Sequence, residues 1–106
     1  MTSEFVVALC TTPDIDTARQ ITGQLLGKKL AACVNILDGV ESHFWWQGKI
    51  ENESECLLVV KTTAALLPAL TETIKELHSY SLPEVITLPI IGGNAEYLAW
   101  LKESTA

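Results

Sequence analysis

The sequence predicts an α+β fold in which helices cover one face of a four-stranded sheet. Apolar segments with strand periodicity alternate with apolar stripes at helical spacing, in the order β-α-β-β-α-β followed by a terminal helix. Hydrophobic residues make up 48% of the 106 residues and charged residues 19%, a balance that favours a packed core and excludes disorder. We therefore expect residues 1–106 to form a single domain.

The first strand is predicted over the uninterrupted apolar run 5–10, which is typical of a strand buried on both faces. Thr12 and Pro13 follow as the predicted cap and first residue of a helix. The helix is expected to end at Gly27, and its apolar stripe consists of Ile15, Ala18, Ile21, Leu25 and Leu26.

A long hairpin is predicted next, with arms over residues 30–46 and 49–62. Asp38-Gly39 indicates a bulge in the first arm, and Gln47-Gly48 indicates a tight turn between the arms. Strands are usually about 5–6 residues long, so the outer half of this ribbon is expected to project beyond the helices.

The remaining elements are a helix, a strand and a short terminal helix. The helix is predicted to begin near Leu67, because Pro68 is tolerated only in the first turn. Residues 85–90 are predicted as a core strand, with Pro89 at the strand end or at the sheet edge. Asn94 is the predicted cap of the last helix. Right-handed connections between these strands give a ferredoxin-like βαββαβ two-layer sandwich.

Three aromatic residues near the hairpin tip indicate that copies of the chain assemble. Adjacent strand residues point to opposite faces, so Trp45 and Trp46, next to Phe44, place indoles on both sides of the ribbon. Neighbouring copies of the chain are the simplest cover for both faces, and their ribbons can close a ring. The alternative is that the tryptophans pack on their own domain.

The charge of the chain argues against several partners. The net charge is −6 and the seven Lys and Arg residues are scattered, so we expect neither nucleic-acid nor anionic-membrane binding. The N-terminus lacks the features of a signal peptide. An odd number of cysteines suggests reduced thiols and a cytoplasmic location, with Cys33 and Cys56 in the core.

No arrangement of residues indicates an enzyme. The chain has no Gly-x-Ser-x-Gly elbow, and the Gly92-Gly93-Asn94 segment is too short for a phosphate loop. Glu51, Glu53 and Glu55 share one strand face, which we interpret as a solvated face in preference to a row that gathers cations.

Eight short blocks recur in the order and with the gaps of one known family. They are CTTPD (10–14), KLAACVN (29–35), WWQGKIE (45–51), KTT (61–63), LPAL (67–70), HSY (78–80), PEV (83–85) and YLAWL (97–101). Together they resemble the CutA family of divalent-cation-tolerance proteins over essentially the whole chain. The resemblance implies a homotrimer similar in shape to the PII signalling proteins, binding of copper or another divalent cation, and a role in metal tolerance.

The resemblance also implies that Cys10 and His78 are copper ligands. Thiolate and imidazole suit copper, but two ligands make a weak site, so a third ligand must come from water, Glu84 or a neighbouring subunit. Leu77 stands where some members of the family carry a second histidine. Without the resemblance, the residues favour Cys10 as a small buried apolar residue and His78 as a cation suited to a helix C-terminus.

Tyr80 and Glu84 flank Pro83 at the same predicted end of the sheet. They are expected either to line a polar cleft at a subunit boundary or to fix their own loop by hydrogen bonds. Two functions follow from the sequence. The first is a trimeric, cytoplasmic, metal-binding protein without enzymatic activity, and the alternative is a PII-like sensor or scaffold that binds a small ligand or a partner protein at its clefts.

Overall fold

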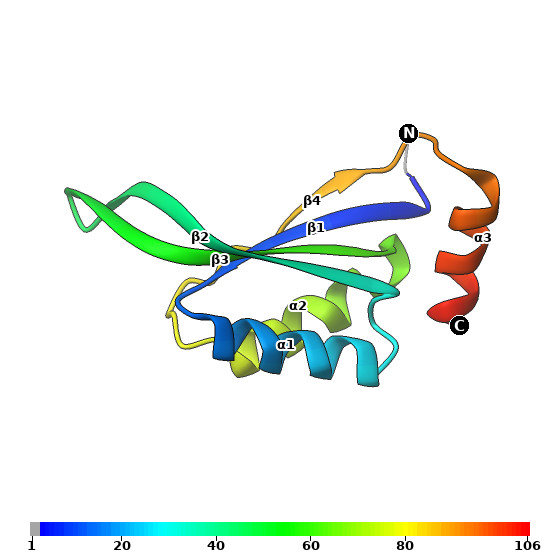
Figure 1. Ribbon diagram of the computed structural model, residues 1–106, viewed down its shortest axis with the longest axis horizontal. Coiled ribbons are helices and arrows are strands. Elements are labelled where there is room, and N and C mark those ends of the chain that lie inside the picture. Colours follow the sequence, from blue (N-terminus) through cyan, green and yellow to red (C-terminus); the bar gives the residue numbers. More distant parts are fainter. Residues whose placement is uncertain (1–2) are drawn as a thin grey trace.

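The predicted α+β class and element order are confirmed by the computed structural model, which describes residues 3–106. One antiparallel sheet has the strand order β2-β3-β1-β4. Helices α1 and α2 cover one face of this sheet, and α3 lies at the end of the sheet near both termini (Figure 1). Met1 and Thr2, part of the segment in which we expect no signal peptide, lie outside the described residues.

The bounds of the elements locate each predicted segment. The strands are β1 (Phe5–Thr12), β2 (Cys33–Trp46), β3 (Lys49–Thr63) and β4 (Ile86–Pro89). The helices are α1 (Ile15–Gly27), the short 3₁₀ helix η1 (Ala64–Leu66), α2 (Leu67–Leu77) and α3 (Ala95–Ser104). α2 begins at the predicted residue, with Pro68 in its first turn.

β1 buries every second residue. Val6, Ala8, Cys10 and Thr12 are buried, whereas the residues between them are only partly covered. The prediction of a strand buried on both faces is wrong for the single chain, because α1 and α2 cover only one face of the sheet (Figure 1). The buried face packs into a core with helix and strand residues that include Ile21, Leu25, Leu58, Val60, Leu70 and Ile74.

α1 is capped by Asp14. The Asp14 carboxylate accepts a 2.7 Å hydrogen bond from the Thr17 backbone N–H, which lowers the pKa of Asp14. The prediction that Thr12 caps the helix with Pro13 at its first position is wrong. Thr12 remains in β1, paired with Cys56, and its hydroxyl donates to the Asp14 carbonyl at 2.9 Å.

The hairpin has the predicted bulge and turn. The pairing of β2 with β3 shifts register between Leu37 and Val40, where Gly39 has a φ of 71°. Gln47 and Gly48 both have positive φ, as a two-residue hairpin turn requires. β2 begins at Cys33, three residues later than predicted. The two arms extend well beyond α1 and α2 (Figure 1), as expected from their 14 and 15 residues.

β4 is shorter and more exposed than predicted. Its four residues, Ile86–Pro89, pair with β1 at the edge of the sheet, and all four are exposed. The prediction of a core strand over residues 85–90 is therefore wrong for 86–89 in the single chain, although Val85 packs against the core. The position of Pro89, at the strand end and on an edge strand, is confirmed.

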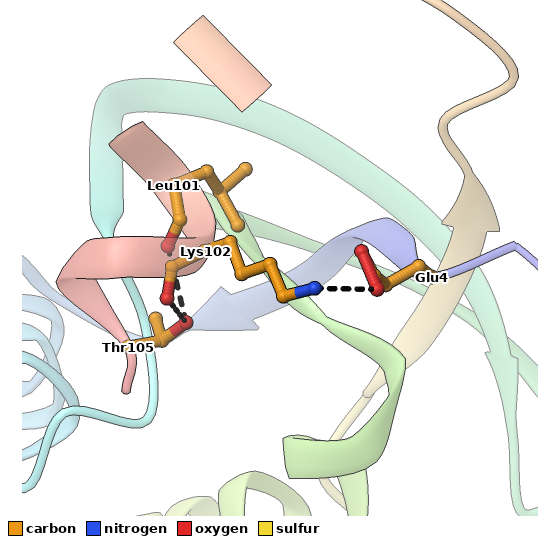
Figure 2. A network of polar contacts seen from close by, with 4 residues as sticks. All are labelled: Glu4, Leu101, Lys102 and Thr105. Carbon is orange, nitrogen blue, oxygen red and sulfur yellow. Dashed lines mark hydrogen bonds and ion pairs between the residues drawn. The ribbon is translucent and has the colours of Figure 1, made fainter. Parts of the chain in front are cut away.

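An ion pair joins α3 to Glu4, the residue before β1 (Figure 2). Lys102 Nζ lies 3.3 Å from Glu4 Oε2, and the Thr105 hydroxyl donates to the Leu101 carbonyl at 3.0 Å. Asn94 caps the helix as predicted, by accepting hydrogen bonds from the first-turn backbone. Across the described part of the chain, each helix is too short or too polar to cross a bilayer.

Candidate functional site

Cys10 and His78 both reach the carbonyl oxygen of Thr11, where β1 ends and the loop after α2 returns to the sheet. His78 is the C-cap of α2, and its Nε2 lies 2.7 Å from the carbonyl oxygen of Thr11, the residue after Cys10. The Tyr80 hydroxyl donates a 2.8 Å hydrogen bond to Glu55 Oε2 on β3. Antiparallel topology predicts this meeting of Cys10, His78 and the start of the last strand.

His78 uses both ring nitrogens within the chain. Nε2 donates to the Thr11 carbonyl, which can only accept, and Nδ1 accepts a 3.1 Å hydrogen bond from the Tyr80 backbone N–H. This arrangement requires a neutral ring with its proton on Nε2. Only 9% of His78 is exposed, so the ring links the end of β1 to the loop after α2.

Cys10 is fully buried as a protonated thiol. Burial, followed by the charges of Glu84 and Glu55, raises the pKa of Cys10 to about 12. Its Sγ donates to the Thr11 carbonyl at 3.6 Å. The thiolate is the form that binds metal, so a ligand role for Cys10 requires loss of this proton.

Glu55 is the acidic centre of the site. It is only 6% exposed, although Glu51 and Glu53 on the same face of β3 are exposed. The interpretation of the three as a solvated row is therefore wrong for Glu55, because the loop that carries Tyr80 covers the inner end of β3. Burial and the bond to Glu55 raise the pKa of Tyr80, and burial and the charge of Glu55 raise the pKa of Glu84.

A cavity of about 870 Å³ lies between the hairpin and the loop after α2. Phe44 and Trp46 from β2 line it together with Tyr80, and both candidate cleft residues, Tyr80 and Glu84, are on its wall. The cavity also has five carboxylates, from Glu41, Glu51, Glu53, Glu55 and Glu84. Tyr80 and Glu84 therefore line an acidic and aromatic cavity within one chain, and their place at a subunit boundary stays a prediction.

The aromatic residues predicted at the interface are exposed in the single chain. Trp45 is 72% exposed, Trp46 40% and Phe44 37%. The alternative, in which the tryptophans pack on their own domain, is wrong for Trp45, whereas Trp46 is partly covered and lines the cavity with the loop after α2. An exposed apolar surface of this kind is typical of an interaction site.

The other polar candidates do not join a metal cluster. Within residues 3–106, no group of three or more His, Cys, Asp or Glu side chains is arranged to hold a metal ion. His43 is exposed on the hairpin, 2.7 Å from Glu41. Cys56 is buried as predicted, but Cys33 is only partly buried, with Tyr97 of α3 next to it.

Fold and site together define a class of small α+β proteins in which a projecting hairpin overhangs an acidic site at the end of the first strand. The model of the family described as CutA1 divalent ion tolerance protein matches residues 6–104. The chain belongs to this family, as the resemblance of its sequence blocks predicts.

Individual relatives agree with this assignment. The chain is 50% identical over 100 residues to "Protein CutA 1, chloroplastic" of Oryza sativa subsp. japonica. The aligned residues make up 94% of this chain and 56% of the rice protein. It is 48% identical over 99 residues to a divalent-cation tolerance protein CutA of Thermus thermophilus. The aligned residues make up 93% of this chain and 96% of the bacterial protein. The chain thus spans little more than half of the rice relative but nearly all of the bacterial one.

A solved structure shows the same fold. The crystal structure of CutA1 from Oryza sativa superposes with a TM-score of 0.95 and 48% identity, covering 99% of this chain and 96% of the rice chain. The projecting hairpin of this chain is therefore part of a fold that is found in a crystal structure.

Sequence reasoning missed two members of the site, Glu55 and the carbonyl of Thr11. The position of Glu55 next to the buried Cys56, at the inner end of the acidic row, is a weak signal for its burial. The Thr11 carbonyl gives no signal in the sequence, since its role depends on the placement of His78.

Proposed function

We propose that the protein acts in divalent-cation tolerance as a cytoplasmic homotrimer that binds copper or another divalent cation, and that it is not an enzyme. Membership of the divalent ion tolerance family supports this role. The observation that supports the proposal is that the His78 ring, 67 positions away in the sequence, and the Cys10 thiol both reach the carbonyl oxygen of Thr11. Thiolate sulfur and imidazole nitrogen are preferred copper ligands.

The donor types fit copper, although neither donor is free within the single chain. Binding requires Cys10 to release its proton and His78 to give up one of its two backbone partners. Bound copper would supply positive charge at a site where burial, followed by the charges of Glu84 and Glu55, raises the pKa of Cys10. We propose that water, Glu84 or a residue of a neighbouring subunit completes the ligand set.

Assembly into a trimer is supported by the surfaces that the single chain leaves open. The hairpin exposes aromatic side chains, and β4 exposes the apolar side chains of Ile86 and Leu88. Together they expose more apolar surface than single, scattered residues would, which is typical of an interaction surface. β2 and β4 are the two edges of the sheet and carry unpaired backbone groups. The cytoplasmic location rests on the three free thiols, which suit a reducing compartment.

Copper titration tests the metal proposal. We expect one ion per chain and an affinity that Cys10→Ala lowers at least about tenfold, since a soft ligand is lost. Zinc, which does not oxidise thiols, serves as a second probe. Cys56→Ala is the matched control, because Cys56 is also buried and free but lies outside the proposed ligand set. Equal weakening by both variants, or none by Cys10→Ala, would contradict the assignment.

The pH dependence of zinc affinity provides a second test. The pKa of Cys10 is raised to about 12, chiefly by burial, so the thiol is protonated throughout the neutral range. Metal binding must displace this proton, and apparent affinity is therefore expected to rise about tenfold for each pH unit between 6 and 8. A flat profile over this range would show that the Cys10 thiolate is not a ligand.

The cavity beside Tyr80 and Glu84 favours a second candidate function, a PII-like sensor or scaffold that binds a small molecule or a partner. Its volume of about 870 Å³ falls in the range of about 300–1,000 Å³ that is usual for ligand pockets. This function predicts binding in the absence of metal, which separates it from the first.

A further inference from the structure

We propose that the loop after α2 couples the metal site to the projecting hairpin, so that use of His78 as a metal ligand releases the base of the hairpin. This inference rests on the proposed function, because it concerns the same site and adds its regulation. It is carried by a chain of contacts that runs from the His78 ring through Tyr80 to Glu55 on β3.

Tyr80 is held by three contacts, two of which are to His78. Its backbone N–H donates to His78 Nδ1 at 3.1 Å, and the centroids of the two rings are 4.7 Å apart. Its hydroxyl donates to Glu55 Oε2 at 2.8 Å. In the described chain, residues 79–84 make no backbone–backbone hydrogen bond. The position of this segment therefore depends on side-chain contacts, and those of Tyr80 join it to both His78 and β3.

Glu55 lies where the outer part of the hairpin begins. It pairs with Val40, the first residue of β2 after the register shift, and the next residue of β3, Cys56, lies opposite the bulge at Asp38-Gly39. Asp38 Oδ1 accepts the Cys56 thiol at 3.3 Å and the following backbone N–H at 2.8 Å, which bridges the interrupted ladder. A bulge bends its strand and interrupts the pairing, so the direction of the outer hairpin is set at this point.

Use of either ring nitrogen of His78 as a ligand removes the bond from the Tyr80 N–H. A neutral imidazole has one donor nitrogen and one acceptor nitrogen. Ligation through Nδ1 uses the lone pair that now accepts the Tyr80 N–H. Ligation through Nε2 requires the ring proton to be on Nδ1, which then faces the Tyr80 N–H as a second donor. The Thr11 contact survives in the first case and is lost in the second, but the Tyr80 bond is lost in both.

The state with Tyr80 bound to the His78 ring and the metal-bound ring therefore exclude each other. A ligand shifts an equilibrium between two states by the difference in its affinity for them. Here the ring can bind metal only after Tyr80 is released, so metal favours the released state. The coupling is reciprocal, and any change that loosens the contact of Tyr80 with Glu55 is expected to raise the affinity for metal.

The coupling connects the metal site to the surface proposed for assembly. Phe44, Trp45 and Trp46 lie on the part of β2 beyond the bulge. A change of direction at the hairpin base moves these residues most, because the tip is the part of the ribbon that lies furthest from the bend (Figure 1). Metal binding is therefore expected to change the contacts of the hairpin with neighbouring subunits.

Tyr80→Phe tests the coupling, because it removes the hydroxyl that holds Glu55 and keeps the ring and the backbone N–H. Release of the loop becomes easier, and the zinc affinity, measured by calorimetric titration at fixed pH, should rise about five- to tenfold. An unchanged affinity would indicate a merely structural tyrosine, and a lower affinity would indicate a tyrosine that binds metal itself. Either result would overturn the proposal.

Tyr97→Phe is the matched control for this variant. It removes the hydroxyl of the other of the two tyrosines, which lies on α3, and should leave the zinc affinity within about twofold. An equal rise in both variants would show that the effect does not depend on the contact with Glu55, and it would contradict the coupling.

Hydrogen exchange followed by mass spectrometry measures the release directly. Ligand binding normally slows exchange by stabilising the native state. We expect saturating zinc instead to raise the exchange rates of residues 79–84 and of the hairpin base, residues 38–40 and 55–57, at least about fivefold, and not to raise that of α1. In Tyr80→Phe the hairpin base should exchange faster without zinc, and zinc should add little.

The outcomes separate this inference from the proposed function. Zinc binding without faster exchange, or with faster exchange in residues 79–84 alone, would overturn the coupling and leave the metal site standing. Failure of the unaltered protein to bind zinc would contradict the proposed function, and the coupling would fall with it.

Discussion

Replacing Trp45 and Trp46 together with serine is expected to convert the proposed trimer into monomers. Trp45 is 72% exposed and Trp46 40% exposed in the single chain, on opposite faces of the hairpin. Burial of a large apolar side chain contributes about 1.5–3 kcal/mol, so two indoles in each of three subunits contribute on the order of 10 kcal/mol to assembly. The loss should raise the concentration at which the trimer dissociates at least about a hundredfold.

Sedimentation equilibrium measures this change directly. The unaltered protein is expected at about three times its chain mass of 11.6 kDa, and the double variant at the mass of a single chain. Trp100→Ser is the matched control, because Trp100 is an exposed indole on α3, away from the hairpin tip. If the double variant stayed trimeric, or if Trp100→Ser caused dissociation instead, the interface would not lie at the hairpin tip. A monomeric unaltered protein would refute the trimer itself.

His78→Ala is expected to lower the free energy of unfolding by about 2–4 kcal/mol, because two backbone groups lose their partner. The Thr11 carbonyl and the Tyr80 N–H both bond to the His78 ring, and His78 is 9% exposed. Urea unfolding at a fixed protein concentration measures the loss, since the stability of an oligomer depends on concentration.

His43→Ala provides the comparison for this effect. His43 is exposed and contacts only an exposed carboxylate, Glu41, so its removal should change the free energy of unfolding by less than about 1 kcal/mol. Similar effects of the two variants would contradict the structural link that His78 makes. A large effect of His78→Ala also means that zinc affinity of this variant must be measured below its unfolding transition.

The hairpin shows what sequence predicts well. Gln47-Gly48 and Asp38-Gly39 require particular backbone angles, and the alternation of polar and apolar residues fixes the register between the turn and the bulge. These signals are local, so they can be interpreted without knowledge of the rest of the fold. The prediction of the α1 cap was wrong although the signal is also local, because Thr12 and Asp14 are both good N-cap residues. The pairing of Thr12 with β3 keeps it in the strand and leaves Asp14 as the cap.

The site was predicted in part. Convergence of Cys10 and His78 at one end of the sheet follows from strand direction alone. The burial of Glu55 does not, because it depends on a loop 25 residues away that brings the Tyr80 hydroxyl onto the carboxylate. The occupied nitrogens of His78 likewise depend on its contact with Thr11, and they change His78 from a free donor into one that must be released before it can bind metal.

The sequence by itself determined the order of the elements, the turns of the hairpin and the family, because periodicity, backbone-specific residues and ordered motifs are properties of neighbouring positions. Only the tertiary structure decided that β1 is covered on one face, that Glu55 opens into an acidic cavity and that the His78 ring links two segments. Burial and charge at each of these positions are set by residues distant in the sequence, and their energies depend on the distance and solvent exclusion that folding creates.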